Sequence, residues 1–151
     1  MDGLDSRTLA QHFVQAWNER DVAAMERLFH PDFTWHIAVT DHGDPKVRPL
    51  QSNLFAGKNI PWDKAIYDKN ETIKIFSGIF EGTAQFSLEP RSFTAEGNRV
   101  AVELVGNARN DANGRQYDNL YCYILEILDG QIVLFREYQD TLLLFDVWVA
   151  R

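Results

Sequence analysis

The sequence predicts an α+β fold, in which N-terminal helices precede a strongly curved antiparallel sheet that wraps around them. Apolar residues recur at helical spacing near the N-terminus, and runs rich in β-branched and aromatic residues fill the second half. No strand alternates with a crossover helix, as a parallel sheet would require. A chain of 151 residues falls in the usual range for one domain. We therefore expect a single domain over residues 1–151.

Two helices are predicted first. Leu9, Phe13 and Trp17 share one face of a helix over residues 6–18. A shorter helix over residues 22–29 follows, because an aspartate can cap its start and a proline lies just beyond its end. The helices supply an apolar surface for the sheet to cover.

The next part of the chain is more varied. The composition of residues 33–39 is typical of a strand, and the apolar spacing of residues 61–80 predicts a helical segment. Between them, prolines and glycines in residues 40–58 predict an irregular segment, whose use as a lid is left open. We interpret its Asp41-His42-Gly43-Asp44 stretch as a solvated loop rather than a metal site.

The remainder is expected to be antiparallel sheet. Asn113-Gly114 and Asp129-Gly130 separate strand-like runs, and such dipeptides favour the tight turns of β-hairpins. The predicted strands cover residues 84–88, 100–109, 115–128 and 131–141.

Composition excludes several classes of protein. The net charge of −7 without a basic run disfavours binding to nucleic acid. The longest apolar run, residues 120–125, is too short for a membrane span, and the N-terminus lacks a secretory pattern, so we expect a cytoplasmic protein. The single cysteine, Cys122, is expected to be a buried, inert thiol. No phosphate-loop, zinc or serine-hydrolase motif occurs, so we expect neither a cofactor nor a metal.

Pairing along the last hairpin singles out one carboxylate. A two-residue turn at positions 129–130 places Glu137 opposite Cys122, with Phe135 and Gln139 on the same face. Burial among apolar neighbours raises the pKa of a carboxyl group into the range useful for proton transfer. Alternatively, Glu137 pairs with a basic residue across the sheet, or a bulge turns it outward.

The opposite face of this hairpin carries aromatic and charged residues, among them Tyr121 and Tyr138, which would suit a homodimer interface on the convex side. On the strand before it, we favour Leu104 and Gly106 facing inward. The facing of Asp118 stays open, and we keep it as a secondary candidate for the site.

Five stretches of the sequence resemble parts of a known superfamily. The stretches FVQAWNERD (13–21) and LFHPDFTWH (28–36) resemble the opening of the nuclear transport factor 2-like superfamily. The stretches GRQYDN (114–119), DGQI (129–132) and FREYQDT (135–141) resemble the end of its SnoaL-like branch, which includes polyketide cyclases and relatives of ketosteroid isomerase. The resemblance implies a cone-shaped sheet, the cystatin-like α+β barrel, around a hydrophobic cavity.

Two activities of that superfamily fit poorly. Where ketosteroid isomerases carry a tyrosine and two aspartates, this chain has Phe13, Ile37 and Cys122. Only Glu137 matches the acidic and polar residues of limonene-epoxide hydrolases, whose other positions are taken by Leu104, Gly106, Trp35 and Ile37.

The phenazine-biosynthesis A and B proteins are more similar near the C-terminus, where Tyr-x-Asn and Arg-Glu-Phe elements match residues 117–119 and 136–138. This resemblance implies that Glu137 is the acid/base group and that Tyr117 lines the site. Strand alternation instead places Tyr117 on the other face unless a bulge intervenes. His36 is a candidate partner base, although alternation opposes it to Trp35.

The leading hypothesis is a dimeric, cofactor-free SnoaL-like enzyme that acts on a small hydrophobic carbonyl or polycyclic compound by acid/base proton transfer. Cyclisation, isomerisation and dehydration all fit. The alternative is a non-catalytic domain that binds a small molecule or acts as a scaffold. The residues expected to line the cavity are Trp17, Trp35, Trp62, Phe76, Phe80, Leu104, Cys122, Phe135 and Gln139.

Overall fold

The computed structural model describes residues 5–37, 46 and 64–149. Two helices begin the described chain, α1 (Ser6–Asn18) and α2 (Val22–Leu28), and they confirm the two predicted helices. Asp5 begins α1 because its side chain accepts a hydrogen bond from the backbone N–H of Thr8, at 2.7 Å. Asp21 caps α2 in the same way through Ala24.

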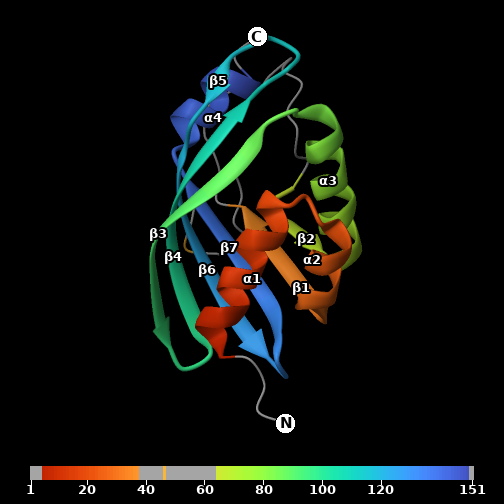
Figure 1. Cartoon of the computed structure of the whole chain (residues 1–151), viewed down its shortest axis with the longest axis vertical. Coiled ribbons are helices and arrows are strands. Elements are labelled where there is room, and N and C mark those ends of the chain that lie inside the picture. Colours follow the sequence, from red (N-terminus) through yellow and green to blue (C-terminus); the bar gives the residue numbers. More distant parts are fainter. Residues whose placement is uncertain (1–4, 38–45, 47–63, 150–151) are drawn as a thin grey trace.

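A seven-stranded, curved sheet follows, with strand order β2-β1-β7-β6-β4-β3 and with β5 paired to β4 (Figure 1). The α+β class is confirmed. The sheet does not close into a barrel, and β1 runs parallel to β7, whereas the sequence predicts only antiparallel pairs. The strands are β1 (Phe29–Ile37), β2 (Ile66–Asp68), β3 (Phe86–Glu96), β4 (Arg99–Arg109), β5 (Gln116–Tyr117), β6 (Leu120–Leu128) and β7 (Gln131–Gln139).

Two later helices differ from the prediction. The helical segment expected over residues 61–80 is the short strand β2 followed by α3 (Lys69–Gly82), which starts at a capping box formed by Asp68 and Glu71. A final helix, α4 (Thr141–Trp148), is not predicted from the sequence, and it begins at the residue where the predicted last strand ends. Asp140 ends that strand by accepting hydrogen bonds from the first backbone N–H groups of α4.

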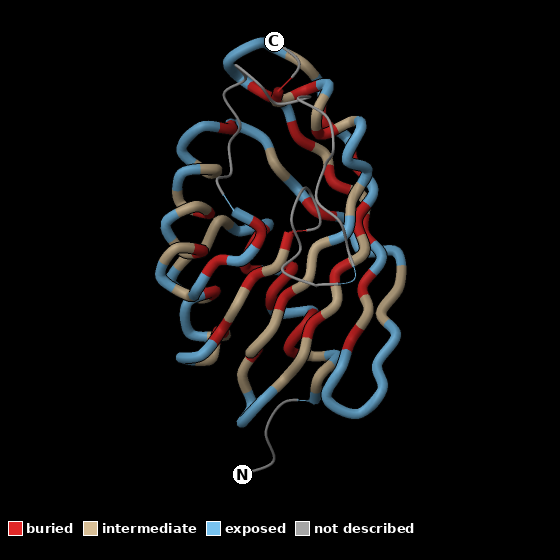
Figure 2. The backbone as a smooth tube through the Cα atoms, turned by 180° about the vertical axis from the view of Figure 1, so that it is seen from behind, coloured by how far each residue is buried: buried red, intermediate tan, exposed pale blue. Residues whose placement is uncertain are grey.

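The core lies between the helices and the concave face of the sheet, where buried positions alternate along the strands (Figure 2). Phe13 of α1 is at its centre, with ring centroids 5.3 Å from Phe135 and 5.8 Å from Phe29. All three side chains are almost fully buried. Helix α1 covers the lower strands, and α3 lies beside β1 (Figure 1).

The turn after α1 holds α3 in place. Arg20 has a positive φ of 56°, and its guanidinium donates to the carbonyl oxygens of Phe80 and Thr83, each at 2.8 Å. Asn18 exchanges two hydrogen bonds of 2.8 Å with the backbone of Leu88 in β3. These bonds connect the end of α1 to both α3 and the sheet.

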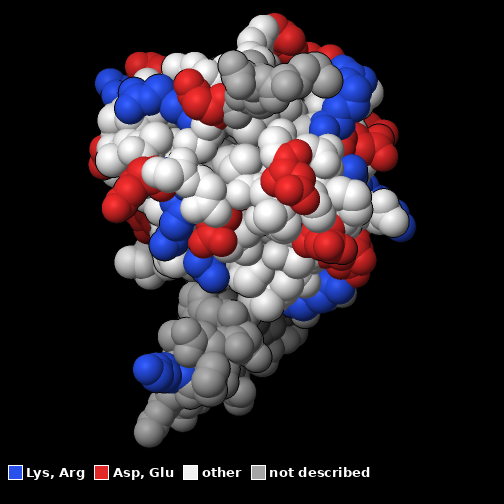
Figure 3. All heavy atoms as spheres, turned by 90° about the horizontal axis from the view of Figure 1, so that it is seen from below, with Lys and Arg blue, Asp and Glu red and all other residues white. Residues whose placement is uncertain are grey.

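Acidic and basic side chains are interspersed on the face shown in Figure 3. Within the described residues, no helix is both long enough and apolar enough to cross a membrane.

Candidate active site

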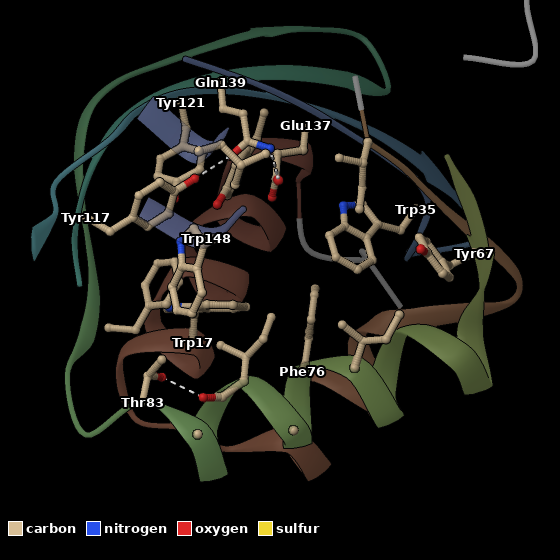
Figure 4. Close-up of a pocket in the computed structure, with 18 residues that line it drawn as sticks. Trp17, Trp35, Tyr67, Phe76, Thr83, Tyr117, Tyr121, Glu137, Gln139 and Trp148 are labelled. Atoms are coloured by element: carbon tan, nitrogen blue, oxygen red, sulfur yellow. Dashed lines mark hydrogen bonds between the residues drawn. The ribbon is translucent and has the colours of Figure 1, made fainter. Parts of the chain in front are cut away.

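A pocket of about 410 Å³ lies between the upper, concave part of the sheet and helices α3 and α4 (Figure 4). Its wall is mainly aromatic and aliphatic. Six residues that the sequence analysis proposes for the site line it: Trp17, Trp35, Phe76, Tyr117, Glu137 and Gln139. The other lining residues are Ile37, Tyr67, Ile75, Gly78, Ile79, Gly82, Thr83, Phe86, Tyr121, Tyr123, Leu144 and Trp148.

A bulge in β7 decides which residues face the pocket. Near the turn the strands pair as predicted, Leu128 with Gln131, but the register then shifts, and Tyr123 rather than Cys122 lies opposite Glu137. The shift leaves Val133 without a pairing partner on β6. Because side chains alternate between the two faces of a strand, one extra residue reverses the facing of every later residue relative to β6.

The shifted register explains how Tyr117 lines the site, as the family resemblance implies, although simple strand alternation places it on the other face. Tyr117, Tyr121 and Tyr123 alternate with exposed or half-buried residues, and all three face the pocket together with Glu137. Cys122 lies on the convex face, paired with Tyr138, so the prediction that it lines the pocket is wrong. Its thiol is half-buried there, and this burial raises its pKa.

A chain of hydrogen bonds leads to Glu137. The Asn119 side-chain N–H donates to the Tyr117 hydroxyl at 2.9 Å, and that hydroxyl donates to Gln139 Oε1, also at 2.9 Å. Gln139 Nε2 then donates to Glu137 Oε2 at 3.1 Å (Figure 4). Burial raises the pKa of Tyr117, which keeps its proton on the hydroxyl and so preserves this direction.

These hydrogen bonds give the two carboxyl oxygens of Glu137 different roles. Glu137 Oε2 is an acceptor for Gln139, while Oε1 has no hydrogen-bond partner among the described residues. In the protonated state the proton therefore belongs on Oε1, because Oε2 accepts a hydrogen bond. Oε1 is the atom that can exchange a proton with a ligand.

Burial governs the ionisation of Glu137. Removal from water disfavours the carboxylate and raises the pKa of Glu137 from its ordinary value of 4.5 to about 8. No lysine, arginine or histidine is among the described residues that line the pocket, and Glu137 forms no ion pair with any described residue. The alternative prediction, in which Glu137 pairs with a basic residue across the sheet, is therefore wrong for the described residues.

Helix α4 completes the pocket, and the sequence analysis misses it. The side chains of Asn110 and Asn113 both donate to the carbonyl oxygen of Val147, at 3.1 Å and 2.9 Å. They hold the helix so that Trp148 packs edge-to-face on Tyr117, with centroids 5.7 Å apart. An aspartate before an apolar run, here Asp140, is the signal that would have predicted this helix.

Other lining residues depend on pairings that sequence patterns do not reveal. Tyr67 belongs to the three-residue strand β2, which is placed by its pairing with β1. The ring of Tyr121 lies over Gly106, where an added Cβ would come within 2.5 Å of it. The absence of a side chain at Gly106 is therefore what makes room for a pocket-lining tyrosine.

Several proposed site residues lie elsewhere. Asp118 is exposed and bonded to Gln116, so its assignment to the site is wrong. His36 faces away from the pocket, as alternation indicates, and lies 3.1 Å from the Thr34 hydroxyl. The pKa of His36 is lowered mainly by its burial and, to a smaller extent, by the positive charge of Arg136. The remaining corrections are Phe80, Leu104 and Phe135, which pack around the pocket or in the core without lining it.

Two predictions fall outside the described residues, namely the lining role of Trp62 and the irregular segment over residues 40–58 with its Asp41–Asp44 stretch. Among the residues that are described, no group of three or more histidine, cysteine, aspartate or glutamate side chains could hold a metal ion.

Two glycines of α3, Gly78 and Gly82, line the pocket and are exposed. Nothing lies within 4 Å of a Cβ added at Gly78. We expect Gly78→Ala to raise the free energy of unfolding in urea by about 0.5 to 1 kcal/mol, because glycine weakens a helix interior.

We expect the longer side chain of Gly78→Leu to occupy the pocket and weaken the binding of the bicyclic hydrocarbon tetralin, measured by tryptophan fluorescence. Unchanged tetralin binding by Gly78→Leu would contradict this placement of the pocket.

Solved structures share this fold at low sequence identity. An NTF2-like protein from Burkholderia xenovorans superposes with a TM-score of 0.72 and 18% identity, covering 98% of each chain. IdmH from Streptomyces antibioticus, a proposed polyketide cyclase, gives a TM-score of 0.71 and 15% identity over 95% of this chain and 97% of its own. An LEH-like epoxide hydrolase from M. tuberculosis gives 0.68 and 15% over 98% of this chain and 92% of its own.

No match was found among the curated proteins. The model of one family, described as the SnoaL-like domain, matches residues 10–135, which is most of the chain and runs from within α1 to the first part of β7. With the curved sheet and the helices inside it, this match identifies the chain as a member of the SnoaL-like domain family.

Proposed function

We propose that this chain is a cofactor-free enzyme that removes a proton from the carbon next to the carbonyl group of a small hydrophobic compound, with Glu137 as the base. The observation that carries the proposal is the carboxyl group of Glu137 in an otherwise mainly apolar wall, with its pKa raised to about 8. Such a carboxylate is a stronger base than an ordinary glutamate, and part of it is ionised near neutral pH.

The proposed first step uses Glu137 Oε1. The proton moves from carbon to Oε1, the electron pair of the C–H bond forms a carbon–carbon double bond, and the π electrons of the carbonyl group move to its oxygen, which gives an enolate. Gln139 keeps its hydrogen bond to Oε2 throughout. Protonated Glu137 then returns the proton to another carbon in an isomerisation, to a departing hydroxyl in a dehydration, or to the new alkoxide when the enolate carbon attacks a second carbonyl.

The shape and lining of the pocket support a flat, apolar compound. Phe76 and Trp17 meet edge-to-face with centroids 5.0 Å apart, and Trp35 meets Phe76 at the same distance. Aromatic walls of this kind bind ring systems by stacking and edge contacts. IdmH, one of the structural neighbours, is itself named as a proposed polyketide cyclase, which is consistent with a ring-forming reaction.

A pH profile tests the base. We expect the enzyme-dependent exchange of the α-hydrogens of 2-tetralone for deuterium, followed by proton NMR, to rise in kcat/KM from about pH 6 and to level off above about pH 8, because the carboxylate is the active form. The spontaneous rate is subtracted by varying the enzyme concentration. A profile that is flat, or that falls with pH, would contradict the role of Glu137 as base. Binding of 2-tetralone without any enzyme-dependent exchange would favour the non-catalytic alternative.

The homodimer through the convex face stays a prediction. That face carries Leu120 and Tyr138, which are 67% and 48% exposed, with the half-buried Val105 and Cys122 beside them. Exposed apolar side chains that lie together favour an interface between proteins.

A further inference from the structure

Two buried hydrogen-bond donors in the pocket wall have no acceptor among the residues that the structure describes. The indole N–H groups of Trp17 and Trp35 make no hydrogen bond with any described residue, although each residue is only 5% exposed. Buried polar groups in proteins are almost always paired, because an unpaired donor loses its bond to water without replacement. Both rings line the pocket, so a bound ligand contacts them, and a small turn of a ring is needed to bring its N–H, which has almost no accessible surface here, onto an acceptor.

The two indoles differ in their surroundings. Trp17 meets three phenylalanine rings edge-to-face, at 4.8 to 5.1 Å, and aromatic faces are weak acceptors for N–H groups. Trp35 meets one phenylalanine ring, that of Phe76, edge-to-face at 5.0 Å and lies almost parallel to Phe135, at an interplanar angle of 8°. In Figure 4 the nitrogen of Trp35 is on the edge of the ring that faces the Glu137 side of the pocket. The Trp35 donor is therefore directed at the side of the pocket that holds the proposed base.

The sheet sets the spacing between this donor and Glu137. Strands β1 and β7 run parallel, with Trp35 beside Phe135 and Ile37 beside Glu137. Trp35 and Glu137 therefore face the same pocket from adjacent strands, two residues apart along the strand direction. A group of a few atoms, such as a carbonyl and its neighbouring carbon, can lie between the two side chains.

We propose that the indole N–H of Trp35 binds the carbonyl oxygen of the substrate, next to the carbon from which Glu137 takes the proton. This inference rests on the proposed function and adds a second residue that contacts the reacting atoms. As the C–H bond breaks, negative charge moves to the oxygen, and a buried N–H donor stabilises that charge more strongly than it stabilises the ketone. Trp35 thereby selects compounds with an oxygen acceptor over hydrocarbons of the same shape.

The test compares 2-tetralone with tetralin, which has the same bicyclic frame without the oxygen. Binding is measured with the wild type, Trp35→Phe and the matched control Trp17→Phe, each of which loses one indole N–H and keeps an aromatic ring. We expect Trp35→Phe to bind 2-tetralone about tenfold more weakly and to bind tetralin as the wild type does. Its rate of α-hydrogen exchange should fall on the order of 10²-fold. Trp17→Phe should change the affinity for both probes to the same extent.

Proton NMR of the wild-type indole N–H signals gives a second readout, and if Trp35→Phe does not fold, the Trp35 signal is assigned by elimination with Trp17→Phe, Trp62→Phe and Trp148→Phe. We expect one signal to move downfield with 2-tetralone and to stay in place with tetralin, and the signal missing in Trp35→Phe identifies it. Equal loss of affinity for both probes in Trp35→Phe, or no downfield shift, would overturn the role of Trp35 and leave that of Glu137 standing. A ketone-specific shift of this signal together with full exchange activity in Glu137→Gln would instead keep the donor and overturn the proposed base.

Discussion

Glu137→Gln is expected to lower kcat/KM for the α-hydrogen exchange of 2-tetralone on the order of 10²-fold to 10⁴-fold, the usual contribution of a general base. Glutamine has nearly the same size and can still accept the hydrogen bond that Gln139 Nε2 donates, so the pocket keeps its shape. What it loses is the oxygen that takes up a proton. Binding of 2-tetralone, measured by tryptophan fluorescence, should change by less than about threefold, since hydrogen bonding to an amide replaces that to a carboxyl.

The control for this variant is Glu103→Gln. Glu103 is also a strand glutamate, but it lies on the exposed face of β4, where it accepts a hydrogen bond from Ser92. The same chemical change there should leave exchange activity unaltered. If Glu137→Gln retained the wild-type rate, or if both variants lost activity equally, Glu137 would not be the base.

The free energy of unfolding is expected to fall in the wild type, relative to Glu137→Gln, as the pH rises from about 5 to about 9. The pKa of Glu137 is raised to about 8 in the folded state, against an ordinary value of 4.5 in the unfolded chain. Between these values the folded state holds a proton that the unfolded state has released. The folded state thus binds more protons, and stability decreases with increasing pH across this window.

One pKa unit corresponds to about 1.4 kcal/mol. Glu137 is only half-buried, which reduces the effect, so we expect a relative loss of about 2 to 4 kcal/mol. Urea unfolding of both proteins at several pH values measures it, and most of the change should be complete once the pH passes about 8. Because Glu137→Gln retains every other titratable group, the difference between the two curves isolates this carboxyl. Parallel curves would mean that Glu137 has an ordinary pKa in the folded state.

The helices show how far local patterns reach. The apolar spacing of Phe13 and Trp17 correctly predicts α1 and its buried face, because that spacing depends only on the helical period. Helix α4 carries an equally local signal in Asp140 but follows directly on a strand, so extending the strand pattern concealed it. Its position against the pocket depends on Asn110 and Asn113, more than thirty residues away in the chain.

The site shows where local patterns stop. Glu137 stands out in the sequence as a carboxylate in an apolar strand, and the structure places it in the pocket wall. Its partners do not stand out in the same way. Tyr117, Tyr123 and Gln139 come together there only because β7 bulges at Val133, and the same bulge places Cys122 on the convex face.

Residue type and short-range period are enough to predict the α+β class, the first two helices and Glu137 as the candidate acidic group. The side chains that surround Glu137 depend instead on how distant strands pair. One extra residue in a strand leaves its alternation unchanged but exchanges the two faces beyond it, so the facing of Glu137 relative to β6 depends on where the ladder of hydrogen bonds shifts.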